Sequence, residues 1–303
     1  MTRNYDHIIQ AITDEVWALK PEKLDAICEL IRLKAAGVDL PPYEAAAAAE
    51  PRNGAGIAVI PIFGLITNRA NMMTNYSGGT SLTMFRKAFR TALADPDIGT
   101  IILEVDSPGG TVVGLEETAN EIFAARKGSK RIVAIANAQA ASGAYWLASQ
   151  ASELWVTPSG EVGSIGVYAV HDDLSKSLEQ KGIKTTYIRA GKYKAEGVAE
   201  EPLSEDARAY MQKRVDEYYA MFVKAVAGGR EVHVNKVING FGEGRMVGAQ
   251  EAVKMGMVDR VGTIDELIRT LTARIRRPVE GNGWAHRTGS LSLADQRRRA
   301  RYN

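Results

Sequence analysis

The sequence predicts an α/β protein with a largely parallel sheet. Short apolar runs rich in β-branched residues, such as those at 57–66 and 131–138, are typical of buried strands. Segments with apolar residues at helical spacing follow these runs, and this alternation favours parallel pairing through right-handed crossovers. No internal repeat of about 20 to 50 residues is present, which argues against a solenoid.

The expected elements alternate from residue 57 onward, and the helix that starts after Ser81 has a serine at its cap position. The expected strands are 57–66, 99–110, 131–141, two short strands within 153–170, and 181–191. The expected helices are 81–95, 115–127, one directly after Ser142, and 205–230.

The pattern divides the chain into four parts. Two short helices are expected within 5–36, on either side of Pro21. The tail holds eight Arg and two acidic residues, so it is a solvated extension or else a docking arm for an acidic partner or nucleic acid. The expected parts are an N-terminal helical appendage at 1–40, a Pro/Ala/Gly-rich linker at 41–56, the main α/β domain at 57–273 and the basic tail at 274–303.

Composition argues against several functional classes. The net charge of +2 does not point to nucleic acid or acidic lipid, and no run approaches the ~18 apolar residues of a membrane span. The start of the chain lacks the apolar region of a targeting peptide, so a cytoplasmic protein is expected. The single cysteine, Cys28, allows no intrachain disulfide, and its apolar helical position predicts a buried structural thiol.

The segment AQAASGAYWLAS is the strongest candidate for a nucleophile. Ser142 stands among small residues where a strand passes into a helix, so the free N–H groups and the dipole of the helix face it. The alternative is that Ser142 is only a helix N-cap.

Three other segments carry weaker signals. Gly109 and Gly110 end the segment DSPGG, where glycines can expose N–H groups to an oxyanion, although Pro-Gly-Gly is also ordinary turn chemistry. Lys192 and Lys194 follow the glycine that ends an expected strand, but both could be surface lysines. Ser164 lies in GSIGV, which could equally be a hairpin or bulge with a structural serine.

Together, in this order, DSPGG, SGAY, GSIGV and GKYK resemble the signal peptide peptidase A family of Ser–Lys serine peptidases, which includes phage-type capsid maturation proteases. The segment at 244–262 resembles the family's closing motif, so the resemblance covers roughly residues 57–270. It implies a ClpP/crotonase-like superhelix of strand–strand–helix units and a homo-oligomer. The membrane anchor of the bacterial members has no counterpart in this sequence, which favours the phage-like branch, acting in the host cytoplasm or prohead.

The resemblance also implies roles for individual residues. Ser142 matches the nucleophile, Lys194 the general base, and Ser164 a serine that positions the lysine amine. The backbone N–H groups of Gly109 and Gly143 match the oxyanion donors, with Gly110 as a third candidate. Lys192 does not match.

A lysine base has to be shifted, because its ordinary pKa of about 10.4 leaves it protonated at neutral pH, and burial in an apolar site can lower that pKa. A histidine base is not excluded by position, but none of the four histidines, His7, His171, His233 and His286, lies in a small-residue segment. Metal-binding and nucleotide-binding motifs are absent from the sequence, so no metal or cofactor is expected.

Several functions remain open. The leading one is an endopeptidase acting on a capsid or scaffold polypeptide, and the second is a peptidase that degrades signal-peptide remnants. A crotonase-like acyl-CoA enzyme would need Glu104 or Glu116 as its acid/base, and a non-catalytic structural protein would leave Ser142 inert. Self-cleavage is conceivable in the linker at 41–56 or in the tail beyond Arg274, because exposed segments are where nicking concentrates.

Overall fold

The computed structural model describes residues 15–36, 38, 52–54, 56–70 and 79–276. The chain has two compact units, Met1–Ile264 and Asp265–Asn303. The sheet and its connecting helices belong to the first unit. Helix α11 (Ile264–Arg276) covers the described part of the second. The expected linker at 41–56 and tail at 274–303 lie largely outside the described residues.

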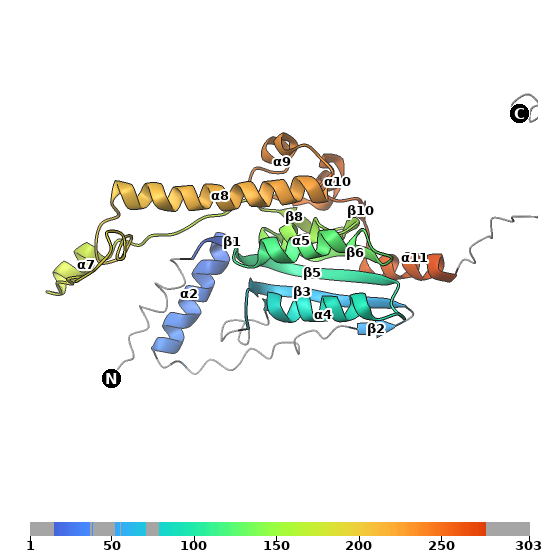
Figure 1. Ribbon diagram of the computed structural model, residues 1–303, viewed down its shortest axis with the longest axis horizontal. Helices are drawn as coiled ribbons and strands as arrows, with labels where there is room; N and C mark the ends of the chain where they lie inside the picture. Colours follow the sequence, from blue (N-terminus) through green and yellow to red (C-terminus); the bar gives the residue numbers. More distant parts are fainter. Residues whose placement is uncertain (1–14, 37, 39–51, 55, 71–78, 277–303) are drawn as a thin grey trace, which may run out of the picture. The chain divides into compact units, whose positions relative to one another are not determined.

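Parallel strands form the centre of the sheet (Figure 1). β5 (Thr100–Thr111) pairs in parallel with β3 (Ile57–Thr67) on one side and with β6 (Arg131–Ala141) on the other. β7 (Glu153–Val156) follows in parallel beside β6. The predicted α/β class with a largely parallel sheet is therefore confirmed. The shorter strands are β2 (Arg52–Gly54), β4 (Thr80–Ser81), β8 (Glu161–Gly163), β9 (Met246–Gly248) and β10 (Arg260–Val261).

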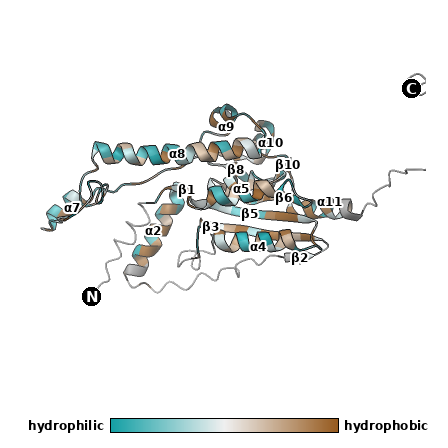
Figure 2. Ribbon diagram, in the orientation of Figure 1, coloured by the Kyte–Doolittle hydropathy of each residue, from teal (hydrophilic) through white to brown (hydrophobic). Residues whose placement is uncertain are grey.

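Helices between the strands pack their apolar residues into one core, as expected for crossover connections. Ser81 caps the first of them as predicted, because its hydroxyl accepts the N–H of Met84 at 3.5 Å. Figure 2 shows apolar residues along the strands and mostly hydrophilic ones at the start of α8. The helices are α4 (Leu82–Ala94), α5 (Leu115–Ala125), α6 (Gly143–Ala148), α8 (Glu205–Gly229), α9 (Val234–Gly240) and α10 (Ala249–Met255).

The first predicted helix is wrong where the structure describes it. Trp17–Leu19 forms strand β1, which pairs antiparallel with the end of β5 (Figure 1). The end of β5 offers backbone groups for pairing, and such tertiary pairing overrides a weak local helical preference. The second predicted helix is α2 (Pro21–Ala35), in which Cys28 is buried as expected. Residues 1–14 lie outside the described part.

The strand predicted at 181–191 is also wrong. These residues form no strand in the single chain, and every one of them is exposed. They follow the short helix α7 (Ser175–Gln180) and precede α8. We call residues 181–194 the exposed arm. These residues have strand-forming side chains, but their backbone has no neighbouring strand to pair with. β-propensity alone therefore does not determine the structure of this segment.

No helix in the described part of the chain combines the length and apolar character that crossing a membrane requires.

Candidate active site

Ser142 lies where β6 ends and α6 begins, as predicted. Its backbone has φ 52° and ψ −120°, a conformation that costs energy for a residue other than glycine. The surrounding backbone holds it there, because the Ser142 N–H donates to the Gly163 carbonyl at 2.7 Å. Its hydroxyl donates to the carbonyl of Gly166 at 3.3 Å, and the residue is 1% exposed. Strained backbone of this kind is concentrated at functional sites.

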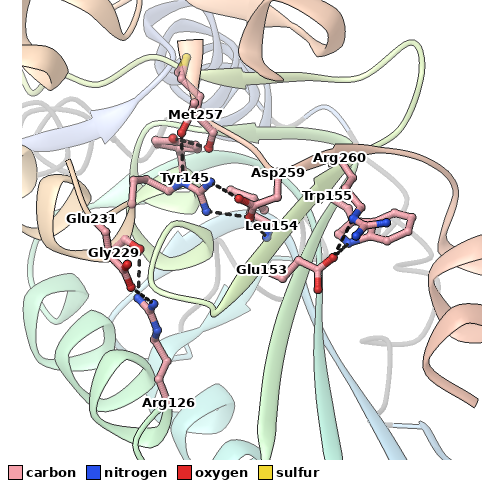
Figure 3. Close-up of polar contacts among 12 residues, drawn as sticks. Arg126, Tyr145, Glu153, Leu154, Trp155, Gly229, Glu231, Met257, Asp259 and Arg260 are labelled. Carbon is pink, nitrogen blue, oxygen red and sulfur yellow. Dashed lines mark hydrogen bonds and ion pairs between the residues drawn. The ribbon is translucent and has the colours of Figure 1, made fainter. Parts of the chain in front are cut away.

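The helix that follows Ser142, α6, is held in place by two of its aromatic side chains. The hydroxyl of Tyr145 donates to the Met257 carbonyl at 2.8 Å, and burial raises the pKa of this phenol (Figure 3). The ring of Trp146 stacks on Phe222 of α8 with centroids 4.6 Å apart. Because both aromatic side chains are buried, the start of α6 cannot shift without disturbing the core.

A paired arginine and carboxylate hold the segment that Tyr145 contacts. Arg230 binds Asp259 through two hydrogen bonds of 2.7 and 3.0 Å. Asp259 also accepts the N–H of Leu154 at 2.7 Å (Figure 3). Burial opposes the charge on Asp259, but these hydrogen bonds outweigh it and lower the pKa of the carboxyl. The pair thus ties the end of α8 to β7 and to the segment after Met257.

Gly109 and Gly110 lie near the end of strand β5, and we call this pair the glycine turn. Both positions require glycine for steric reasons. A Cβ added at Gly110 would lie 1.8 Å from the carbonyl oxygen of Ile66. One added at Gly109, where φ is 102°, would lie 2.1 Å from the carbonyl oxygen of Ala18. The N–H of Gly109 is already used, because it donates to the Ser107 hydroxyl at 3.1 Å.

The glycine turn and the start of α6 meet. A Cβ at Gly109 would lie 3.1 Å from the backbone nitrogen of Gly143, and one at Gly143 would lie 3.5 Å from that of Gly110. The structure therefore brings together four of the six predicted site residues, namely Ser142, Gly109, Gly110 and Gly143.

Ser164 lies in the loop that contacts Ser142. Its φ is 53°, and its N–H donates to the Arg245 carbonyl at 2.8 Å. The preceding Gly163 pairs with Ala141 across the β6–β8 ladder. This loop therefore lies against the end of β6, beside the predicted nucleophile.

Lys194 is the predicted site residue that the single chain leaves exposed. It belongs to the exposed arm, and its backbone N–H donates to the Gly191 carbonyl at 3.2 Å. Lys192, which did not match the family pattern, lies over the Tyr193 ring at 4.6 Å and is also exposed. The burial that a lysine base requires is thus not provided by the single chain.

Strand β1 is a part of the site that sequence reasoning missed. It is paired to the glycine turn, with Ala18 opposite Gly110 and Leu19 opposite Gly109. The carbonyl oxygen of Ala18 also lies 3.2 Å from the position of a Cβ added at Gly143. No motif marks this segment, since its four apolar residues fit a helix as well as a strand.

The carboxylates considered for an acyl-CoA enzyme have local partners. Glu104 accepts a hydrogen bond from Asn137 at 2.8 Å, and Glu116 accepts one from Asn120 at 3.1 Å. Within the described ranges, no group of three or more His, Cys, Asp or Glu side chains could hold a metal ion.

Comparison with known proteins adds sequence evidence. The model of the family described as Peptidase family S49 matches residues 124–276, which is 153 of the 303 residues. A head-tail preconnector protein of Enterobacteria phage P21 is 29% identical over 99% of this chain and 63% of its own length. Capsid assembly protease C of Escherichia phage lambda is 33% identical over 68% of this chain and 46% of its own length.

Similar proteins also occur outside phages. A putative protease of Methanocaldococcus jannaschii is 33% identical over 58% of this chain and 56% of its own length. The chain thus spans roughly half to just under two thirds of these relatives. A solved structure of a membrane-bound stomatin-specific protease aligns over 70% of this chain and 82% of its own, with 18% identity and a TM-score of 0.44.

Proposed function

Because this chain belongs to peptidase family S49, we propose that it is a serine endopeptidase in which Ser142 is the nucleophile and Lys194 the general base. One observation carries the proposal: a strained, buried serine at a strand end directly precedes Gly143, which meets Gly109 and Gly110, two positions where backbone atoms leave no room for a Cβ. A structural N-cap would need neither the strained backbone nor the glycines around it. We assign the peptidase domain to residues 57–273, with the basic tail after it. The two parts before it each add a short strand to its sheet, because β1 pairs with β5 and β2 pairs with β3.

The oxyanion would be held by backbone N–H groups at the glycine turn and the start of α6. Gly110 and Gly143 are the favoured donors, because the N–H of Gly109 is engaged by Ser107. Gly109 then has a steric role, since its positive φ and missing side chain let another backbone pass close by. Losing one oxyanion donor typically costs about 10²–10³ in rate.

Lys194 would reach its working environment only in an assembly. An amine in bulk water stays protonated and cannot accept the serine proton. The exposed arm carries apolar side chains, including Ile188 at 100% exposure and Ile183 at 52%, which favours burial against another copy. We therefore propose a homo-oligomer in which the arm of one subunit brings Lys194 to Ser142 of its neighbour.

The chemistry follows from these positions. The neutral amine of Lys194 takes the proton of Ser142, whose oxygen attacks the scissile carbonyl. The amine then returns the proton to the leaving nitrogen, and water hydrolyses the acyl-enzyme. Ser164 would position the amine, since its loop lies against the end of β6 beside Ser142.

Mixed assemblies test the proposal. Ser142→Ala and Lys194→Ala proteins should each fail to cut an unstructured polypeptide. When the two are co-expressed, about a quarter of the sites in a randomly mixed oligomer would join an intact serine to an intact lysine. Recovery of activity near that fraction is expected, with each variant co-expressed with the double variant as the inactive control. Absence of recovery would place both groups in one subunit, and activity in Lys194→Ala alone would remove the dyad.

The substrate is proposed from the relatives. Two of them are named as capsid assembly protease and head-tail preconnector protein, so we propose a capsid or scaffold polypeptide, cut in the host cytoplasm or prohead. Incubation with proteins encoded beside its gene, followed by mass spectrometry of the fragments, tests this. Cleavage of signal peptides but not of capsid or scaffold proteins would instead favour the housekeeping role.

A further inference from the structure

We propose that residues 16–20 occupy the substrate groove of this site as an intramolecular substrate, and that the enzyme cuts its own chain between Ala18 and Leu19. This inference rests on the proposed peptidase function and adds to it a self-processing site and a substrate class.

The segment is seated as an extended substrate would be. β1 runs antiparallel to the glycine turn, with Trp17 opposite Thr111, Ala18 opposite Gly110 and Leu19 opposite Gly109. Hydrogen bonds continue this pairing at both ends: Val112 N–H donates to the Val16 carbonyl at 3.3 Å, and Lys20 N–H donates to the Pro108 carbonyl at 3.2 Å.

The alternation of the ladder identifies the carbonyl that faces the oxyanion donors. Val16/Val112 and Lys20/Pro108 are both hydrogen-bonded pairs. In an antiparallel ladder such pairs recur every second residue, so Ala18/Gly110 is also one, and the Gly110 N–H points to the Ala18 carbonyl oxygen. The start of α6 lies close to the same oxygen, which is 3.2 Å from a Cβ position built on Gly143. Ala18 thus presents its carbonyl where the scissile carbonyl of a substrate belongs.

The opposite edge of the segment is paired as well. Trp17 and Tyr168 exchange two backbone hydrogen bonds, of 2.9 and 3.0 Å. Tyr168 lies two residues after Gly166, whose carbonyl accepts the Ser142 hydroxyl. Residues 16–20 are therefore inserted between the glycine turn and the loop beside the nucleophile, and Ser142 is 1% exposed in this arrangement.

Side chains of the segment indicate which polypeptides fit. Ala18 is fully buried, so the position before the cut accepts a small residue. Lys20, two residues after the bond, pairs with Glu161 at the start of β8 at 3.0 Å, so that position favours a basic residue. Trp17 and Leu19 pack in an apolar cluster with Leu24 and Leu65. The inferred substrate is an extended chain with small, large apolar and basic residues in succession around the cut.

The cleavage step is balanced by water alone. Ser142 Oγ bonds to the Ala18 carbonyl carbon while its proton passes to the general base. The bond from that carbon to the Leu19 nitrogen then breaks, and the base returns the proton to this nitrogen. Water hydrolyses the Ala18 ester, leaving a carboxylate on Ala18, a free amine on Leu19 and the original serine.

Intact-mass analysis and N-terminal sequencing of the purified full chain test the inference. Wild type should lose residues 1–18 and acquire a new N-terminus that reads Leu-Lys-Pro-Glu-Lys, whereas Ser142→Ala stays whole. If wild type cuts an added polypeptide but leaves the Ala18–Leu19 bond intact, self-processing is wrong and the proposed function stands. If it cuts neither and Ser142 takes no serine-directed probe, the proposed function fails and the inference fails with it.

A second measurement tests occupancy of the groove apart from cleavage. All proteins in this comparison carry Ser142→Ala, so that the chain stays uncut. Lys20→Glu places two carboxylates together, so residues 16–20 should leave the groove more readily and their backbone amides should exchange hydrogen for deuterium about 2- to 5-fold faster. Adding Glu161→Lys should restore the exchange rate of the Ser142→Ala protein by reversing both charges. Lys23→Glu is the matched control, because Lys23 is exposed on α2 and should not change the rate. Equal exchange with and without Lys20→Glu would contradict the groove assignment.

Synthetic peptides test the substrate class without altering the protein. A peptide with the sequence of residues 14–23 should be cut between its alanine and leucine by the processed enzyme. Replacing that alanine by tryptophan should abolish the cut, and replacing the first lysine by glutamate should slow it about 2- to 5-fold. Cleavage of all three peptides at one rate would show that the buried Ala18 and the Lys20–Glu161 pair do not select substrates.

Discussion

The two members of the proposed dyad have very different surroundings. Ser142 is buried, strained and fixed by a hydrogen bond to Gly163, with Tyr145 anchored directly behind it. Lys194 lies in an exposed arm, where its backbone N–H donates to the Gly191 carbonyl. One chain therefore folds the proposed nucleophile and the proposed oxyanion donors into place by itself. In the proposed homo-oligomer, another copy would supply the burial that keeps an amine neutral.

This difference separates two kinds of variant. Changes near Ser142 alter the packed interior, so they should lower stability as well as activity. Changes in the arm affect exposed side chains, so they should lower activity and assembly while the single chain stays as stable as before.

The largest expected effect is the loss of the base. Lys194→Ala should lower the rate of peptide cleavage by about 10⁴-fold or more, with the melting temperature unchanged because the side chain is exposed. Lys192→Ala is the matched control two residues away, and it should keep activity near the wild-type level. Equal losses in the two variants, measured with one fluorogenic peptide, would contradict the assignment of Lys194.

A change in the glycine turn should, unlike the loss of Lys194, lower the stability of the single chain. Gly110→Ala puts a Cβ 1.8 Å from the Ile66 carbonyl oxygen, so the strand must move and the free energy of unfolding should fall by about 1–3 kcal/mol or more. Gly228→Ala is the control, because this exposed helical position has no atom within 4 Å of the added Cβ and should gain stability slightly. Urea unfolding of the two proteins measures both effects. Equal stability of Gly110→Ala and wild type would show that the turn adjusts freely.

Local patterns in the sequence were sufficient to predict the parallel sheet and the neighbourhood of Ser142. Alternating apolar runs and helical spacing fixed the order of strands and helices. The small residues around Ser142 and in Pro-Gly-Gly predicted that backbone segments lie close together there. This prediction needs only the residue types, because a small side chain leaves room for another backbone. The predicted nucleophile and glycines therefore lie together in the structure.

What could not be predicted depends on partners distant in the sequence. Trp17–Leu19 became a strand because it pairs with the end of β5, about 90 residues further along the chain. Residues 181–191 have strand-forming side chains but no neighbouring strand, so they form none in the single chain. Neither outcome is encoded in the segment alone, because pairing energy belongs to both strands.

A smaller loss of stability is expected from breaking the Arg230–Asp259 pair. Arg230→Met leaves Asp259 without its two charged hydrogen bonds, so the free energy of unfolding should fall by about 1–3 kcal/mol. Arg208→Met is the control, since Arg208 only meets Glu205 on the exposed surface of α8. Because the pair supports Met257, which Tyr145 contacts, some loss of activity should accompany the loss of stability. Unfolding by urea and cleavage of one peptide by both variants would measure the two losses.

The last expected effect is a pH dependence from the same pair. The pKa of Asp259 in the folded protein is lower than its ordinary 3.8, because hydrogen bonds from Arg230 and Leu154 outweigh the burial that opposes its charge. A carboxyl with a lowered folded pKa contributes stability that is fully present above the ordinary value and disappears as the pH falls through the folded one. The difference in unfolding free energy between wild type and Asp259→Asn should therefore be largest near neutral pH and shrink below about pH 4. Denaturation at pH 3, 4, 5 and 7 measures this, and a difference that does not vary with pH would show that the Asp259 charge is not what ties β7 to the end of α8.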